Sequence, residues 1–289
     1  MTITAKRFQV PGGPTLAYDD AGDEGASPVV VLHGVTAGRR DWEWFGVTAK
    51  LATEHRVFVL DQRGHGDSDR TPGTYRLPDY ASDLVAFLEN VVGGPAALVG
   101  HSLGGLVSAQ VAADRPELVR RAFFEDAPVY WTTEVWMEAV RNGEFDQFQL
   151  LAQLLRVHHD QRGTVEQLAD LIGMMPVPLG AGTIAEWLGV EGTLAYASCL
   201  QGFDPDAIPP ALEGSFLDGF DRTRPIRCPV HALRADPARD ARFFAEHEAP
   251  FLATHPQATV ELVEGAGHLI HIEQTERFLT SVLAFLAAT

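Results

Sequence analysis

The stretch AALVGHSLGG, residues 96–105, decides how this sequence is interpreted. Residues 96–99 form a short continuous apolar run, which is typical of a strand buried on both faces of a parallel sheet. The run leads into GHSLG at residues 100–104, a G-x-S-x-G pattern, and small apolar residues suited to a buried helix follow. In such a strand–turn–helix unit the serine hydroxyl is lifted above the sheet, and the glycines avoid clashes with neighbouring backbone. The stretch therefore predicts a nucleophilic serine, Ser102.

Apolar runs of the same kind recur on both sides of this stretch, and helical patterns separate them. Continuous runs occupy residues 29–32 and 57–60, and strand-like segments that include polar residues occupy 122–125, 230–233 and 259–263. Strands that alternate with helices indicate right-handed βαβ units. We therefore predict an α/β fold with a mostly parallel central sheet and helices on both faces. Gly12 and Gly13 indicate a hairpin turn near the start of the chain.

The rhythm of strands and helices breaks after Pro128. Residues 129–225 contain no apolar strand run of comparable quality, and they are helical and aromatic in composition. The strand pattern resumes near residue 226. We therefore expect one core domain, residues 1–128 and 226–289, interrupted by a helical cap at residues 129–225.

A serine hydroxyl is a poor nucleophile until a base takes its proton. In folds with this turn, the acid and then the histidine follow the serine along the chain. His268 ends the stretch EGAGH at residues 264–268, directly after a predicted strand, and its glycine-rich loop lets the imidazole reach the serine. His271 is the nearest competitor, and we interpret it as the start of the last helix.

Two aspartates compete to orient the histidine. Asp126 follows the run 122–125, and Asp236 follows the run 230–233, so both lie at the strand ends where α/β sheets place their chemistry. We favour Asp236, because its loop lies one strand before the strand that carries His268. Asp126 is the alternative acid, and otherwise has a structural role at the mouth of the insertion.

An oxyanion hole needs two preorganised hydrogen-bond donors. The backbone N–H of Leu103, directly after the serine, supplies one of them. The loop after the run 29–32 supplies the other, and Val35 N–H is our candidate. We interpret His33, in the same loop, as a structural histidine.

Several tryptophans are candidates for lining a substrate pocket. Trp131 and Trp136 follow the strand end at Asp126, and Trp42 lies near the predicted oxyanion loop. Each of them is also compatible with simple core packing.

Together these motifs resemble the α/β-hydrolase superfamily. The resemblance rests on His33-Gly34, DQRGHGDS at residues 61–68, the GHSLGG stretch, Asp236 and Gly267-His268. It covers about residues 7–128 and 226–287, and it extends to the cap by position only. In this superfamily the 61–68 loop is structural.

The resemblance implies acyl transfer to water through an acyl-serine, with no metal or organic cofactor. Relatives that hydrolyse epoxides or haloalkanes carry an aspartate where Ser102 stands, so neither chemistry is expected. We expect a carboxylesterase or lactonase acting on a medium-sized, largely apolar molecule, because aromatic residues fill the cap. Carbon–carbon bond hydrolases, thioesterases and cofactor-free haloperoxidases keep the same triad and remain alternatives. A ligand-binding receptor of the same fold is the non-enzyme alternative.

Composition narrows the partners of this chain. Its 289 residues carry a formal net charge of −17, which disfavours binding to nucleic acid and to anionic membranes. We expect a neutral small-molecule substrate and, without a secretory signal, a cytoplasmic location. Cys199 and Cys228 form neither a disulfide framework nor a zinc motif. We expect the adjacent pair His158-His159 to lie on a solvated surface. Nothing in the sequence indicates an oligomeric state.

Overall fold

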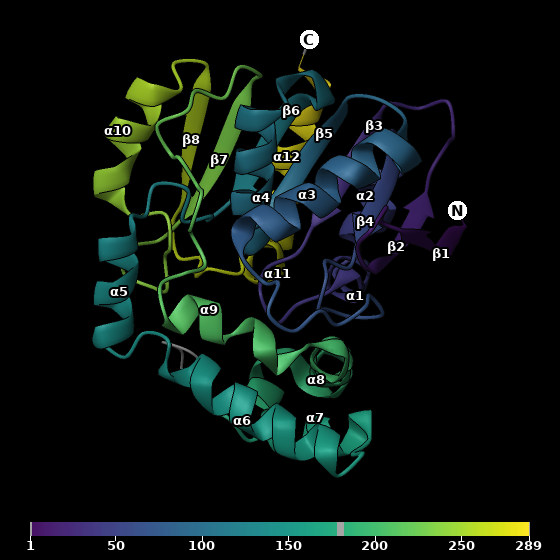
Figure 1. Cartoon of the computed structure of the whole chain (residues 1–289), viewed down its shortest axis with the longest axis vertical. Coiled ribbons are helices and arrows are strands. Elements are labelled where there is room, and N and C mark those ends of the chain that lie inside the picture. Colours follow the sequence, from purple (N-terminus) through teal and green to yellow (C-terminus); the bar gives the residue numbers. More distant parts are fainter. Residues whose placement is uncertain (1, 178–181, 289) are drawn as a thin grey trace.

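A computed structural model describes residues 2–177 and 182–288. Its centre is an eight-stranded sheet in the order β1-β2-β4-β3-β5-β6-β7-β8 (Figure 1). The strands are β1 (Ile3–Gln9), β2 (Thr15–Ala21), β3 (Pro28–Leu32), β4 (Arg56–Leu60), β5 (Ala96–His101), β6 (Val119–Glu125), β7 (Val230–Ala235) and β8 (Ala258–Val263). Strands β3 to β8 run parallel, whereas β2 pairs antiparallel with both β1 and β4. The mostly parallel α/β sheet predicted from the sequence is confirmed.

Alternate residues of the central strands face two separate layers of helices, as the period of two in a strand requires. Val30 and Leu32 of β3 belong to the core cluster that contains buried residues of α3 (Leu77–Phe87), α4 (Leu103–Asp114) and α10 (Ala245–Thr254). Val29 and Val31 pack with the other layer. That layer consists of α1 (Arg39–Trp44), α2 (Val47–Leu51), α11 (Ile270–Glu273) and α12 (Thr275–Ala287). Strand β5 lies at the centre and is buried along its whole length.

A second group of helices lies between β6 and β7 in the chain. They are α5 (Thr133–Arg141), α6 (Asp146–Asp160), α7 (Val165–Gly173), α8 (Ile184–Gly202) and α9 (Pro209–Leu212). Figure 1 shows α6 to α9, in teal and green, grouped beyond one end of the sheet. No strand of the sheet is formed by the described residues between Glu125 and Val230. All five helices fall within residues 129–225, where the cap was expected.

Short helical turns complete the fold: a π-helical extension of α3 (Leu88–Val92) and two 3₁₀ turns (Pro116–Leu118 and Pro205–Ala207). The expected hairpin is present, with Gly12 at φ +73° between β1 and β2. The search for apolar runs in the sequence did not identify β1 or β2 as strands. The side chains of β1 are mostly exposed, so this edge strand has no buried run to recognise.

Candidate active site

Ser102 lies in the sharp turn between β5 and α4, where the sequence predicts it. Its backbone has φ 49° and ψ −110°, which is strained for a residue with a side chain. Close packing around the turn explains its glycines. A Cβ on Gly104 would lie 2.3 Å from the carbonyl oxygen of Leu32, and one on Gly105 would lie 2.3 Å from Ala127 Cβ. Neighbouring backbone therefore holds the serine at the end of β5.

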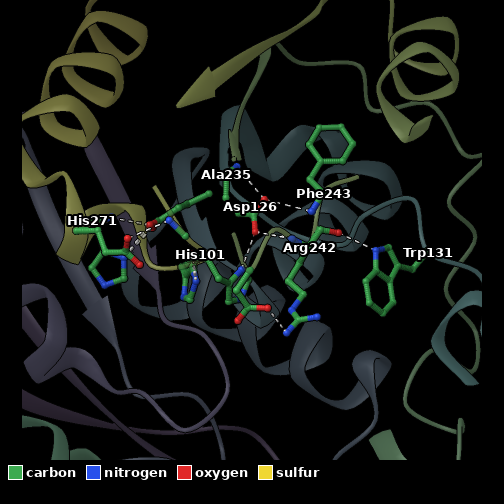
Figure 2. Close-up of polar contacts among 12 residues, drawn as sticks. His101, Asp126, Trp131, Ala235, Arg242, Phe243 and His271 are labelled. Atoms are coloured by element: carbon green, nitrogen blue, oxygen red, sulfur yellow. Dashed lines mark hydrogen bonds and ion pairs between the residues drawn. The ribbon is translucent and has the colours of Figure 1, made fainter. Parts of the chain in front are cut away.

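His268 lies in the loop between β8 and α11, and its partner is Asp126. The distance from His268 Nδ1 to Asp126 Oδ2 is 2.7 Å. Asp126 directly follows β6 and is completely buried. Its carboxylate also accepts hydrogen bonds from three backbone N–H groups: Ala235 at 3.0 Å, Arg242 at 2.6 Å and Phe243 at 3.2 Å (Figure 2). Four donors thus fix this carboxylate against the imidazole.

The expectation that Asp236 orients His268 is wrong. The carboxylate of Asp236 accepts hydrogen bonds from the backbone N–H groups of Gly265, at 2.8 Å, and Ala238, at 2.9 Å. These two bonds lower the pKa of this exposed group. Asp236 therefore shapes the loop that carries His268 without contacting its ring.

Sheet order gives the physical reason. Strand β6 is the direct neighbour of β5, whereas β7 lies one strand further out. The backbone N–H of Ser102 donates to the carbonyl of Glu125, the last residue of β6, at 3.1 Å. The residue after Glu125 consequently starts next to the serine, and that residue is Asp126.

His101 is hydrogen-bonded to the backbone of the loop that carries His268. Its Nε2 lies 3.1 Å from the backbone carbonyl of His268, and the two ring centroids are 4.6 Å apart. A carbonyl only accepts, so Nε2 of His101 carries a proton. Burial lowers the pKa of His101 well below its usual value, which keeps the ring neutral. A neutral donor here positions the loop without placing a charge beside the His268 ring.

The two predicted oxyanion donors flank the serine. In the described part of the chain, neither Val35 N–H nor Leu103 N–H donates a hydrogen bond to any protein atom. A Cβ on Gly34 would lie 3.3 Å from Ser102 Cβ, which shows how closely the loop after β3 approaches the nucleophile. Both N–H groups are therefore available to an oxyanion.

Ser102, His268, Val35 and Leu103 line one cavity of about 830 Å³ between the sheet end and the cap helices. Trp131 and Trp136 line it as well. The indole N–H of Trp131 donates to the carbonyl of Arg242, and that of Trp136 to the carbonyl of Ala211, both at 2.7 Å. With their N–H groups occupied, these indoles present apolar surfaces to the cavity.

Trp42 does not line the cavity. It is 1% exposed and packs on the ring of His271 with 4.3 Å between centroids. Core packing, the alternative given by the sequence, is its role. His271 is buried as well, and its Nδ1 bonds Glu125 Oε1 at 2.8 Å.

Other histidines have structural surroundings. Buried His33 lies with Nδ1 2.7 Å from the carbonyl of Gly34 and accepts a hydrogen bond from the backbone N–H of Gln62, as expected for a structural residue. His158 is buried against Gln201, 2.9 Å away, so a solvated surface is wrong for this residue. Within residues 2–177 and 182–288, no group of three or more His, Cys, Asp or Glu side chains could hold a metal ion. No described helix is long and apolar enough to cross a membrane.

Similarity to known proteins agrees with this geometry. Residues 29–280 match the sequence model of a family described as the alpha/beta hydrolase family. The chain is 27% identical to 2-(acetamidomethylene)succinate hydrolase of Mesorhizobium japonicum, over 92% of this chain and 90% of that protein. It is 25% identical to esterase YbfF of Escherichia coli, over 90% of this chain and 93% of that protein. The crystal structure of E-2-(acetamidomethylene)succinate hydrolase aligns with a TM-score of 0.73 and 22% identity, over 99% of this chain and 100% of that one.

Proposed function

We propose that this chain, which belongs to the alpha/beta hydrolase family, is a serine hydrolase that cleaves a carboxylic ester or lactone. One observation carries the proposal: His268, which is hydrogen-bonded to the buried Asp126, lines the same cavity as the strained Ser102. A nucleophile, a base and an orienting acid are the groups that acyl transfer requires. Esterase YbfF is similar to almost the whole chain, which supports the same chemistry.

The contacts give each group a role in the proposed reaction. Asp126, which as a carboxylate only accepts, keeps the proton of His268 on Nδ1, so Nε2 is free to take the proton of Ser102. The serine Oγ then attacks the carbonyl carbon, and the N–H groups of Val35 and Leu103 stabilise the oxyanion. The imidazolium returns its proton to the leaving alkoxide, which departs as an alcohol. Water repeats the sequence and releases the acid.

The cavity favours a largely apolar, uncharged substrate of medium size. Its wall is mostly aliphatic and aromatic, as ligand pockets usually are. Two arginines line it, but each is paired with a carboxylate: Arg242 with Glu144 at 2.8 Å, and Arg239 with Glu273 at 3.3 Å. The substrate named for the Mesorhizobium relative is a succinate. Because both arginines are engaged, we favour a neutral ester over such a dicarboxylate.

The test is a panel of p-nitrophenyl esters of increasing acyl length, aryl lactones and an acyl thioester, with 2-(acetamidomethylene)succinate as a separate arm. We expect turnover of medium-chain esters or lactones, and covalent labelling of wild-type protein by a fluorophosphonate. The Ser102→Ala variant should lose both. Turnover of the succinate alone would overturn the ester assignment. Absence of labelling together with absence of turnover would point to a ligand-binding receptor.

A further inference from the structure

Asp41 is a buried carboxylate at the edge of the cavity, and the reaction proposed above does not use it. It lies in the first turn of α1, shortly after the oxyanion loop, and it lines the cavity. Its side chain is 9% exposed. Among the described residues, no group donates a hydrogen bond to either of its carboxylate oxygens. An ionised carboxylate can accept about four hydrogen bonds, so much of its capacity is unused.

Within residues 2–177 and 182–288, the one basic side chain that forms an ion-pair contact with Asp41 is His271, and its ring is already engaged elsewhere. His271 Nε2 lies 4.0 Å from Asp41 Oδ2, beyond hydrogen-bond length. Nδ1 of the same ring bonds Glu125 at 2.8 Å, and the backbone N–H of His271 donates to Glu125 at 2.7 Å. The two carboxylates raise the pKa of His271 against the effect of its burial. Two carboxylates therefore lie near one imidazole, which bonds Glu125, and Asp41 is the one of the two that lines the cavity.

Two hydroxyl groups from neighbouring segments line the same cavity as Asp41. Thr36 and Tyr196 line the same cavity, and Tyr196 comes from α8, the cap helix packed against α1. Burial raises the pKa of Tyr196 to about 12, so its phenol stays protonated. Burial also raises the pKa of Asp41 to about 6, although His271 opposes this, and the carboxyl is mostly ionised at pH 7. The cavity thus has one polar, acidic end within an apolar wall.

We propose that Asp41 is a substrate-binding residue that accepts a hydrogen bond from a donor group of the substrate, a hydroxyl or a protonated amine. The inference rests on the proposed ester hydrolysis and narrows its substrate to an apolar molecule with one such donor. The Asp41 side chain is only 9% exposed, so its carboxylate has little access to water and a substrate that supplies a donor gains more here than in water. The excess of carboxylates over free cations around the cavity favours a donor over a second anion.

The experiment compares p-nitrophenyl esters of alkanoic acids with four to eight carbons against their ω-hydroxy and ω-amino counterparts. We expect the best-fitting donor ester to exceed its plain counterpart in kcat/KM by about 10- to 100-fold, mostly through KM, as for a hydrogen bond to a charged group. Asp41→Asn should abolish the preference for the amine and weaken that for the hydroxyl. Asp41→Leu should reverse both in favour of the plain chain.

Glu246→Gln is the matched control, because Glu246 also borders the cavity but is exposed. It should leave the donor preference unchanged. A wild-type enzyme with no donor preference at any chain length would overturn the inference, as would an unchanged preference in Asp41→Asn.

A binding measurement separates this inference from the proposed function. In Ser102→Ala, calorimetry with 1-hexanol, 1,6-hexanediol and 6-amino-1-hexanol needs no turnover, and we expect the diol or the amino alcohol to bind at least about fivefold more tightly. This preference should disappear in Ser102→Ala/Asp41→Asn. If esters are not hydrolysed while the preference persists, only the proposed function fails. If esters are hydrolysed and all three alcohols bind alike, only the donor site fails. Should the Asp41 variants not fold, the wild-type and Ser102→Ala comparisons still decide.

Discussion

Replacing Asp126 by asparagine tests the hydrogen bond between Asp126 and His268. Oδ1 of Asp126 accepts from Ala235 and Phe243, and Oδ2 accepts from Arg242 and from His268 Nδ1. An asparagine keeps one oxygen and replaces the other by an NH₂ group, which is a donor. If the amide oxygen of the asparagine accepts from Ala235 and Phe243, its NH₂ group faces the Arg242 N–H and His268 Nδ1, which are both donors. Only the imidazole can adapt, by moving its proton from Nδ1 to Nε2.

The magnitude follows from this arrangement. An imidazole with its proton on Nε2 cannot take the proton of Ser102, and an amide at a triad acid lowers kcat by about 10⁴-fold. Arg242 N–H keeps no acceptor in the buried site, which costs about 1–3 kcal/mol of stability. We therefore expect Asp126→Asn to remain folded at 25 °C, with a modestly lower midpoint in urea and almost no activity.

Asp236→Asn is the matched comparison, because both residues follow a strand end and only one contacts the imidazole. The carboxylate of Asp236 is exposed and bonds only the backbone N–H groups of Ala238 and Gly265. We therefore expect kcat of Asp236→Asn to lie within about threefold of wild type. Steady-state hydrolysis of a medium-chain p-nitrophenyl ester, with urea unfolding of each variant, measures both effects. A larger loss in Asp236→Asn than in Asp126→Asn would refute the assignment of the acid. So would an Asp126→Asn variant within tenfold of wild type.

Two further predictions concern stability. Gly104→Ala should destabilise the protein by more than about 3 kcal/mol or prevent folding, because its Cβ would lie 2.3 Å from Leu32 O. Gly94→Ala, which has open space around it, is the control and should change the urea midpoint little. Equal urea midpoints for the two variants would contradict the packing argument. Burial lowers the pKa of His33 to about 4 and of His65 to about 3, so both stay neutral in the fold while the unfolded chain takes up protons below pH 6.5. Their contribution is complete above pH 6.5, and each loses up to about 1.4 kcal/mol per unit as the pH falls toward 4. The raised pKa values of His271 and Asp41 act in the opposite direction, whereas burial lowers the pKa of His101 as well. Urea unfolding at pH 7.5 and pH 5 should show a net loss of stability, and unchanged stability would contradict the assignment.

Much of the fold is readable from the sequence because burial leaves a pattern. The central strands β3, β4 and β5 have apolar runs, since a parallel sheet covered on both faces admits little else. Strand β1 lies at the edge, where most side chains meet solvent, and it leaves no such run. The position of Ser102 is equally readable, because the close approaches at Gly104 and Gly105 exclude any larger residue from this turn.

The partner of His268 is not readable in the same way. Asp126 and Asp236 both follow strands, and the choice between them depends on the order of strands in the sheet. Chain order suggests β7, the strand before the one that carries His268. The observed order makes β6 the neighbour of β5, and this is a property of the assembled sheet. Sequence motifs give the set of candidate groups, and the topology selects among them.

The same stretches of sequence contain a second acid–histidine pair, and local motifs cannot tell the two apart. Glu125 and Asp126 are adjacent, and side chains of adjacent residues at a strand end point to opposite sides. Asp126 reaches His268, and Glu125 reaches His271, both at hydrogen-bond distance, with the ring of His101 between them at 4.6 and 5.2 Å. Exposure separates the pairs, since the side chain of His268 is 18% exposed and that of His271 only 1%. A base must meet the substrate, so only the pair whose histidine lines the cavity can act on an ester, while the second pair stays in the core beside Asp41.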